Sequence, residues 1–217
     1  MTRLTLDITM SLDGFVAGPN QTVEKPLGEG GERLHEWLYG LASFREHHGE
    51  SGSGGERNAD DDVLRESIDA TGAVLMGRRM FSGGEGAWEG DPVADGWWGD
   101  EPPFGVPVFI LTHHAREPVT KQGGTTYTFV TDGLEAAVTQ ARAAAGDRNV
   151  SVAGGATVVQ QCLRTGLLDE LQIHVAPLLL GDGVRLFENL GAVPAKLEVT
   201  RVIESPAVTH IRYRVVK

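Results

Sequence analysis

Two adjacent glycines, Gly154 and Gly155, separate a short apolar run from a stretch with helical spacing that closes at Gly166. This order predicts a strand, a tight turn and a helix, because glycine lets the backbone turn sharply and lets a ligand approach it closely. The helix would direct its free N–H groups and its positive dipole end at that ligand. The pattern therefore indicates a phosphate-binding turn, although a buried turn without a ligand explains these residues equally well.

Two further predicted strands end in small, basic or hydrogen-bonding residues. They are Gly77, Arg78 and Arg79 after the apolar run at 73–76, and Thr112, His113 and His114 at the end of the run at 107–112. The carboxyl ends of parallel strands share one edge of a sheet, and open α/β sheets bind ligands there. Three such turns predict a site for an extended dinucleotide. No G-x-G-x-x-G follows the first strand, which argues against an ordinary Rossmann domain.

The elements that must position these turns follow from hydrophobic periodicity. Strands are expected at 4–10, 73–76, 107–112, 125–130, 150–153, 171–175, 197–204 and 208–216, and helices from 32, 63, 134 and 156 onward. A capping box at 132–135 opens the third helix. Strand and helix alternate over three quarters of the chain, as a parallel sheet requires, and the last quarter indicates an antiparallel edge. The expected architecture is a single α/β domain over 1–217.

Two segments, at about 45–60 and 82–105, show neither the helical nor the strand periodicity of apolar residues and are expected to be surface excursions. The first contains His47 and His48, but adjacent histidines point apart and no spaced ligand completes a set, so no metal site is expected. The second carries Trp88, Trp97 and Trp98, which could cover a pocket mouth or a subunit contact.

Composition limits the class of protein. Of 217 residues, 41% are hydrophobic and 23% charged, and no apolar run is long enough to span a membrane. The formal net charge of −11 disfavours nucleic acid and anionic membranes as partners. A single cysteine, Cys162, provides no disulfide framework, and the N-terminus lacks a signal-peptide core, so the cytoplasm is the expected compartment.

Several motifs, taken in order, resemble the dihydrofolate reductase family, and most closely the reductase domain of bacterial riboflavin biosynthesis and its stand-alone relatives. They are SLDGFVAGPN at 11–20, VLMGRRMF at 74–81, VFILTH at 108–113 and VAGGATVVQQCL at 152–163, followed by LLDELQIHVAPLLLGDGVRLF. The resemblance covers nearly the whole chain. It implies a dihydrofolate reductase-like sheet, mostly parallel and flanked by helices, with an antiparallel C-terminal edge hairpin.

The resemblance also implies how a dinucleotide would bind. Arg78 and His113 would flank the adenosine 2′-phosphate, while Arg79 would meet the diphosphate. The full set of implied cofactor-binding residues is Ala17, Gly77, Arg78, Arg79, Met80, Thr112, His113, Gly154, Gly155, Ala156 and Thr157. The family's cis peptide is expected between Gly154 and Gly155. Met80 stands where folate enzymes have threonine, which removes a hydroxyl and keeps a backbone N–H.

The expected cofactor is NADPH. A site for NADH usually places an acid on the free ribose hydroxyl, where it would repel a 2′-phosphate. The predicted turns carry Arg78 and His113, with Arg116 close by, and no acid stands among them in the sequence.

The substrate side is less defined. Asp13 and Glu36 are the candidate catalytic carboxylates, but Asp13 could equally be a turn residue and Glu36 a solvated one. Phe15 and Trp37 are candidate substrate contacts, and His174 is expected to point outward from its strand, to solvent or to an interface. The resemblance implies hydride transfer to a small heterocycle of the pteridine or ribosylaminopyrimidine kind, and the alternative is an NADP-binding module without activity. Apolar groups on the tryptophan-bearing loop and on the C-terminal strands predict a homodimer.

Overall fold

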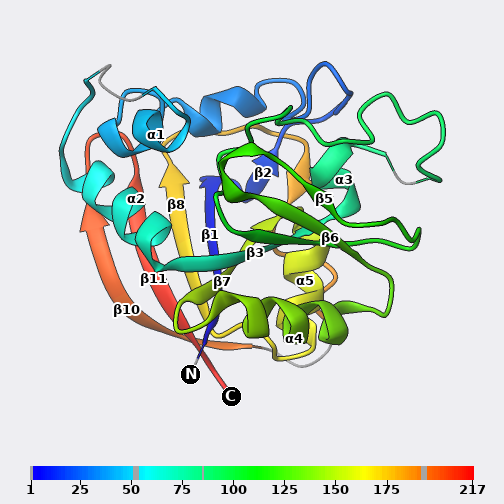
Figure 1. Cartoon of the computed structure of the whole chain (residues 1–217). Helices are drawn as coiled ribbons and strands as arrows, with labels where there is room; N and C mark the ends of the chain where they lie inside the picture. The colour runs from blue at the N-terminus through cyan, green and yellow to red at the C-terminus, as the bar shows by residue number, and fades with distance from the viewer. Residues whose placement is uncertain (1, 51–53, 85, 192–194) are drawn as a thin grey trace.

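The computed structural model describes residues 2–50, 54–84, 86–191 and 195–217, and centres on a twisted sheet (Figure 1). Within these residues the sheet has nine strands in the order β10-β11-β8-β1-β7-β3-β4-β6-β5. The strands are β1 (Leu4–Ser11), β3 (Thr71–Gly77), β4 (Pro107–Leu111), β5 (Val119–Thr120), β6 (Thr126–Val130), β7 (Asn149–Gly154), β8 (Glu170–Ala176), β10 (Lys196–Glu204) and β11 (Thr209–Val216). A separate two-stranded sheet pairs β2 (Phe15–Ala17) with β9 (Val184–Arg185). The expected mostly parallel α/β architecture is confirmed.

The antiparallel edge begins one strand later than the sequence suggested. β8 runs parallel to β1, with Leu6 opposite Leu171, and the C-terminal antiparallel part is formed by β11 and β10. At the other edge of the sheet, β5 also runs antiparallel to β6. Alternating apolar residues give the same signal in either direction, so periodicity could not distinguish the two cases. The short strand β2 lies within the segment expected to be a loop, and the edge strand β5 gave no signal because it is only two residues long.

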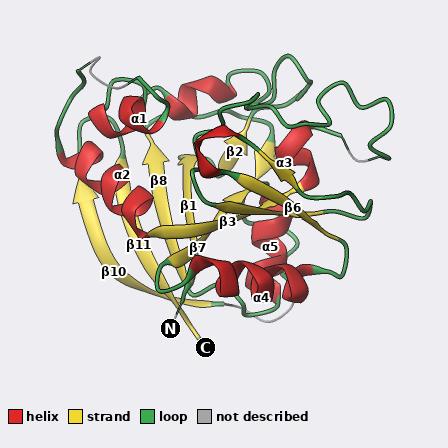
Figure 2. Ribbon diagram, in the orientation of Figure 1, coloured by secondary structure: helices red, strands yellow, loops and turns green. Residues whose placement is uncertain are grey.

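Helices cover both faces of the sheet, as Figure 2 shows. On one face, α4 (Leu134–Ala145) and α5 (Ala156–Arg164) pack on the main core, which includes Leu6, Leu75 and Val152. On the other face, α2 (Ala59–Ala70) lies over β11 and β8. The shorter elements are η1 (Gly31–His35), α1 (Ala42–His47), α3 (Arg78–Ser82) and η2 (Gln122–Gly124). No helix of the described residues is long and apolar enough to cross a bilayer.

The helix expected from 32 to 42 is instead two short pieces. η1 ends at His35, and α1 starts only after Leu41, whose extended backbone (φ −74°, ψ 142°) interrupts the helix. Leu41 forms a parallel bridge with Glu56, which ties part of the expected 45–60 excursion to the body; residues 51–53 of that excursion lie outside the described part. The apolar spacing still predicts which side chains are buried, because Leu34 and Leu41 both lie in the interior.

Two other local predictions need correction. The cap of α4 is Gly133 without a side-chain hydrogen bond, so no capping box forms at 132–135. The described part of the 82–105 loop forms no helix or strand between Ser82 and Pro107, as expected, but its aromatic side chains pack inward. Trp88 lies edge-on to Phe81 and Phe129, so it contributes to the second core cluster.

Candidate functional site

The three strand ends singled out from the sequence meet at one edge of the sheet. β3 lies between β4 and β7 and is parallel to both. Gly77 pairs with Leu111, and Met76 pairs with Gly154, so the turns after these strands lie side by side. The structure therefore brings the predicted dinucleotide-binding turns together.

The glycine pair forms the turn between β7 and α5, and the peptide bond between Gly154 and Gly155 is cis, as expected. A side chain at Gly154 would approach within 2.9 Å of the Met80 sulfur, so this position is closed by its neighbour. At Gly155, by contrast, a Cβ would meet no atom within 4 Å. The backbone of Gly155 thus borders open space at the start of α5, where the N–H groups of Ala156 and Thr157 belong to the unsatisfied first turn.

Arg78 opens α3 and is buried, with 7% of its surface exposed. Its Nη2 donates to the Asp91 carboxylate at 2.5 Å, and the ring of Trp88 lies 3.6 Å from its guanidinium carbon. Among the described residues, its Nε and Nη1 atoms have no hydrogen-bond partner. A buried cation with two unused donors suits an anionic ligand.

The acid beside Arg78 corrects the expectation of a basic cluster without acids. Asp91 comes from the 82–105 loop, as does Asp95, which pairs with Arg116 at 2.5 Å. Burial raises the pKa of Asp91, but hydrogen bonds from Arg78 and from the Val93 N–H outweigh it and hold that pKa below its ordinary value. Asp91 is therefore ionised at neutral pH. The sequence could not reveal these acids as partners because the loop has no periodic structure that would place them.

The loop after β1 forms a tethered turn. The Ser11 hydroxyl donates to Asp13 at 2.6 Å, and the N–H groups of Leu180 and Gly181 donate to the same carboxylate at 3.2 and 2.7 Å. The hydrogen bond from Ser11 is the main cause that lowers the pKa of Asp13. This carboxylate is an ionised anchor between two loops, held by three hydrogen bonds.

The other candidates for the substrate side also occupy structural positions. Glu36 is exposed just beyond η1. Phe15 is buried beneath Arg185, whose guanidinium carbon lies 4.3 Å from the ring centroid, while Ala17 is buried at the end of β2. The indole N–H of Trp37 donates to the Thr9 hydroxyl at 3.1 Å. None of these side chains lines the main groove described next.

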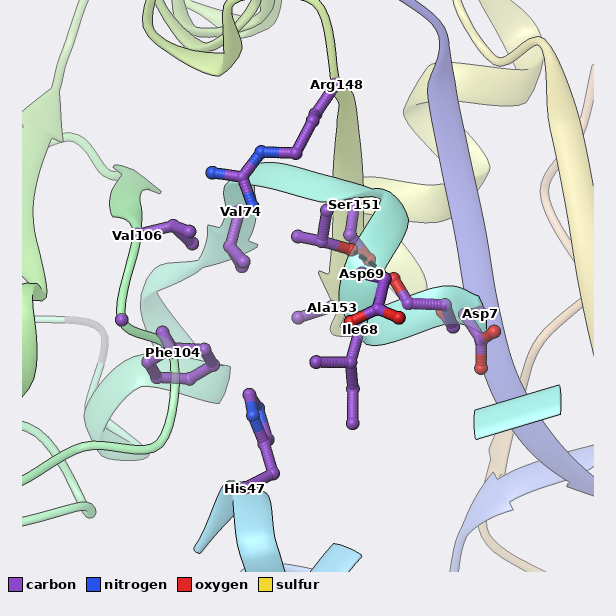
Figure 3. A pocket seen from close by; sticks show the side chains of 13 residues that line it. Asp7, His47, Ile68, Asp69, Val74, Phe104, Val106, Arg148, Ser151 and Ala153 are labelled. Carbon is purple, nitrogen blue, oxygen red and sulfur yellow. Dashed lines mark hydrogen bonds between the residues drawn. The ribbon is translucent and has the colours of Figure 1, made fainter. Parts of the chain in front are cut away.

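A groove of about 470 Å³ crosses the sheet face between α2 and the segment at 104–106 (Figure 3). Arg148 lies at one end and His47 at the other, with Phe104 opposite Asp7. Its full lining is Asp7, His47, Ser67, Ile68, Asp69, Thr71, Val74, Phe104, Gly105, Val106, Arg148, Ser151 and Ala153. Polar groups at one wall and apolar groups at the other suit a small ring compound with polar substituents.

A chain of hydrogen bonds that the sequence did not predict runs beneath α2 from this groove. The Asp7 carboxylate lies 2.7 Å from His174 Nε2, the two Nδ1 atoms of His174 and His210 are 2.6 Å apart, and His210 Nε2 lies 2.7 Å from Asp60. His174 is 3% exposed, so of its two expected placements the solvent-facing one is wrong, and its side chain lies in the contact between β8 and the elements that cover it. It lies on the second face of β8, which α2 and Trp37 cover.

One signal in the sequence could have indicated this chain. On each of their strands, apolar residues alternate with polar ones. Asp7, His174 and His210 occupy polar positions, so all three belong to the faces opposite the main core. The order of the strands, which places β1, β8 and β11 side by side, could not be read from the periodicity.

The edge formed by β3, β4 and β7 fits a nucleotide with anionic groups. Two observations support this: the unpaired donors of buried Arg78, and the open space over Gly155 at the start of a nine-residue helix. Asp91 limits the fit on one side of the guanidinium, since its charge already faces Nη2. Among the described residues, no group of three histidine, cysteine or acidic side chains could hold a metal ion.

The fold places the chain among dihydrofolate reductase-like α/β proteins. A putative riboflavin biosynthesis protein from Shewanella sp. PV-4 has a TM-score of 0.65 and 22% identity, and the match covers 100% of both chains. RibD from Acinetobacter baumannii has a TM-score of 0.56 and 17% identity over 100% of this chain and 58% of its own. A deaminase/reductase from Thermotoga maritima has a TM-score of 0.56 and 15% identity over 99% of this chain and 57% of its own. The chain thus spans somewhat more than half of these two longer proteins.

The sequence matches the RibD C-terminal domain over residues 2–211, and the chain belongs to this family. A search of curated proteins gives no match. Membership of this family supports an oxidoreductase as the general class of enzyme.

Proposed function

We propose that this protein is an NADPH-dependent reductase that transfers hydride to a small heterocyclic substrate of the ribosylaminopyrimidine or pteridine kind. The observation that carries the proposal is Arg78, a buried guanidinium with two unpaired donors at the edge where the three strand-end turns meet. An anionic nucleotide would satisfy those donors. Membership of the RibD C-terminal domain family supports the same reaction class.

The cofactor would lie along the edge of β4, β3 and β7. Its diphosphate would face the first N–H groups of α5 across Gly155, where a side chain would find only open space. Arg78 and His113 would border the adenosine phosphate, with Arg79 beside the diphosphate. The nicotinamide end would extend toward Ala17. When bound, this cofactor supplies a hydride equivalent.

The chain's own residues would provide binding, orientation and exclusion of water. The groove adjoins the cofactor edge because Ala153, which lines it, immediately precedes the glycine pair. A ring bound at the Ala153 end of the groove would be held at a fixed distance from the nicotinamide, and such positioning can supply much of the rate enhancement of a hydride transfer. Arg148, at the far end of the groove, is suited to an anionic substituent of the substrate.

The test is a turnover screen. NADPH oxidation, followed by absorbance, would be measured with a panel of pteridine, aminopyrimidine and quinone-like acceptors. Steady oxidation that requires both protein and acceptor is expected for at least one pyrimidine or pteridine. Tight NADPH binding without turnover on any acceptor would instead support the alternative, a nucleotide-binding module, which the structural roles of Asp13 and Glu36 favour.

A further inference from the structure

The buried chain from Asp7 to Asp60 has a fixed number of protons. It contains three hydrogen bonds of 2.6 to 2.7 Å between four side chains: Asp7 to His174, His174 to His210, and His210 to Asp60. Each bond needs one proton between its two atoms, so the six bonding atoms share three protons. Two ionised carboxylates with two neutral imidazoles would supply only two. The four side chains together therefore hold one extra proton and have a net charge of −1, wherever the protons lie along the three bonds.

The contact between the two imidazoles requires this extra proton. Two bare Nδ1 atoms at 2.6 Å would repel each other, and two protonated ones would clash, so one ring donates and the other accepts. Trp37 packs against both rings, with centroid distances of 4.8 Å to His174 and 5.4 Å to His210. An indole face stabilises a positive ring, and it also shields the pair from solvent.

The extra proton rests nearer the groove end of the chain. Burial lowers the pKa of His210, so the outer ring, His174, is the better site for the positive charge. Burial raises the pKa of Asp7, but the charge and hydrogen bond of His174 outweigh it and hold this pKa below its ordinary value. In the resting protein Asp7 is therefore an ionised carboxylate beside an imidazolium.

Asp7 is placed where a reduced substrate would need a proton. Leu6 pairs with Val152, so Asp7 lies level with Ala153, one residue before the glycine turn. Asp7 and Ala153 both line the groove together with Ser67 from α2, whose side chain helps to lower the pKa of Asp7. Figure 3 shows Asp7 on β1, across the groove from Phe104 and Val106.

We propose that Asp7 is the catalytic acid of the reductase and that the His174–His210 pair supplies its proton. This inference rests on the proposed function, which provides the hydride. Hydride adds to the carbon of a C=N or C=O bond of the substrate, and the π electrons move to the nitrogen or oxygen. His174 Nε2 passes its proton to the Asp7 carboxylate, and Asp7 passes a proton to that atom. His174 is left as a neutral imidazole that keeps the proton of its Nδ1 contact with His210. The product gains one hydride, which carries two electrons, and one proton, and solvent later returns one proton to the hydrogen-bond chain.

Other groups around the chain affect when it is charged. Arg212 on β11 faces Asp7, and Asp60 on α2 faces His210. His35 from η1 lies close enough to His174 to interact electrostatically, and burial lowers the pKa of His35. At neutral pH His35 is therefore neutral. Burial also lowers the pKa of His210, which favours release of the shared proton from this contact as the pH rises.

The kinetic test compares Asp7→Asn with Asp62→Asn, a matched control on the exposed side of the same region. Asp7→Asn should lower kcat about 100- to 10,000-fold, the usual contribution of a general acid, without weakening NADPH binding. It should also abolish the fall in kcat at alkaline pH, and Asp62→Asn should change neither. A second variant, His210→Gln, should lose rate mainly at high pH, because it removes the stored proton and leaves Asp7 in place.

A separate measurement counts the protons without turnover. Nitrogen NMR of ¹⁵N-histidine protein should show three ring protons on the four nitrogens of His174 and His210 near neutral pH, and His210→Gln should remove the shared one. Two or four ring protons on the pair, or an unchanged kcat in Asp7→Asn, would overturn the inference and leave the proposed function intact. If the unmodified protein reduces no acceptor, the proposed function fails, and the catalytic role of Asp7 fails with it.

Discussion

The strand-end edge around Gly154 and the buried chain around His174 are polar sites on one sheet, but they arise from the sequence in different ways. The edge is built from three short segments, and each has a local signal such as a glycine pair or a glycine followed by arginines. The hydrogen-bond chain is built from single residues of β1, β8, β11 and α2, and its directly bonded partners lie up to 167 positions apart. No segment of the sequence contains more than one of its four members in a recognisable motif.

The two regions also differ in what holds their charges. At the edge, Arg78 keeps unpaired donors and the backbone of Gly155 borders open space, which suits a ligand that binds reversibly. In the hydrogen-bond chain, every bonding atom between Asp7 and Asp60 is paired with an atom of another side chain. This arrangement suits a proton that moves between side chains held in place. Incomplete hydrogen bonding thus indicates the binding region, and complete hydrogen bonding indicates the proton store.

The largest expected effect is a loss of folding stability when the hydrogen-bond chain loses Asp60, the carboxylate at its inner end. In Asp60→Ala, the charge that the His174–His210 pair stores would remain buried without its inner carboxylate. Breaking such a buried pair typically costs about 3–5 kcal/mol of unfolding free energy. Urea denaturation would measure this, with Asp62→Ala as the exposed control. A loss no greater than that of the control would show that the pair is not charged, and the contrast between the two regions would weaken.

A second prediction tests the edge. In Gly155→Ala the new methyl group meets no protein atom within 4 Å, and the backbone φ of −72° is open to alanine. Folding should be unaffected, whereas NADPH affinity should fall about tenfold or more, since a lost charge-assisted hydrogen bond costs about 1.5–3 kcal/mol. Calorimetric titration measures the affinity, and Gly86→Ala, also in open space, is the control. Equal affinities of the two variants would place the diphosphate elsewhere.

These two predictions differ in how far the sequence could anticipate them. Gly155 and Arg78 were found from local patterns, because a strand, a turn and a helix start are each encoded by adjacent residues. The acid beside Arg78 and the partners of His174 depend on which strands and loops become neighbours, and periodicity does not encode this. The same limit explains why β8 was expected to be antiparallel. Asp13, also chosen from its local loop, proved to be an anchor for residues 180–181 that no local pattern reveals.

A third prediction concerns Asp91, the loop carboxylate that pairs with the Arg78 guanidinium and so competes with an anionic ligand for it. Asp91→Asn keeps a side chain of similar shape but removes a negative charge 2.5 Å from the guanidinium. Arg78 should then attract a 2′-phosphate more strongly, so the preference for NADPH over NADH should rise by about tenfold, the value of one charge-assisted hydrogen bond. Parallel titrations with both nucleotides measure this ratio. An unchanged ratio would mean that Arg78 does not meet the 2′-phosphate.

The smallest effect on the site concerns an edge surface of the sheet, on the face of β11 opposite His210. The β10 residues Leu197, Val199 and Val202 are 39%, 56% and 58% exposed, and their partners Val215, Tyr213 and Ile211 alternate along β11, so the three share one face. We propose that this apolar face forms a homodimer contact. Val199→Lys with Val202→Lys should convert a dimer to a 23.2 kDa monomer in light scattering, with little change in NADPH affinity. A monomer before mutation would refute the contact.

The most direct test of the central claim is a titration of the unmodified protein with NADPH and with NADH, followed by nicotinamide fluorescence at two salt concentrations. Because Arg78 keeps two buried donors at the edge of β3, NADPH should bind at least about tenfold more tightly than NADH, and the difference should shrink as salt is raised. Equal affinity for the two nucleotides, or no binding of either, would contradict the assignment of this edge as the cofactor site.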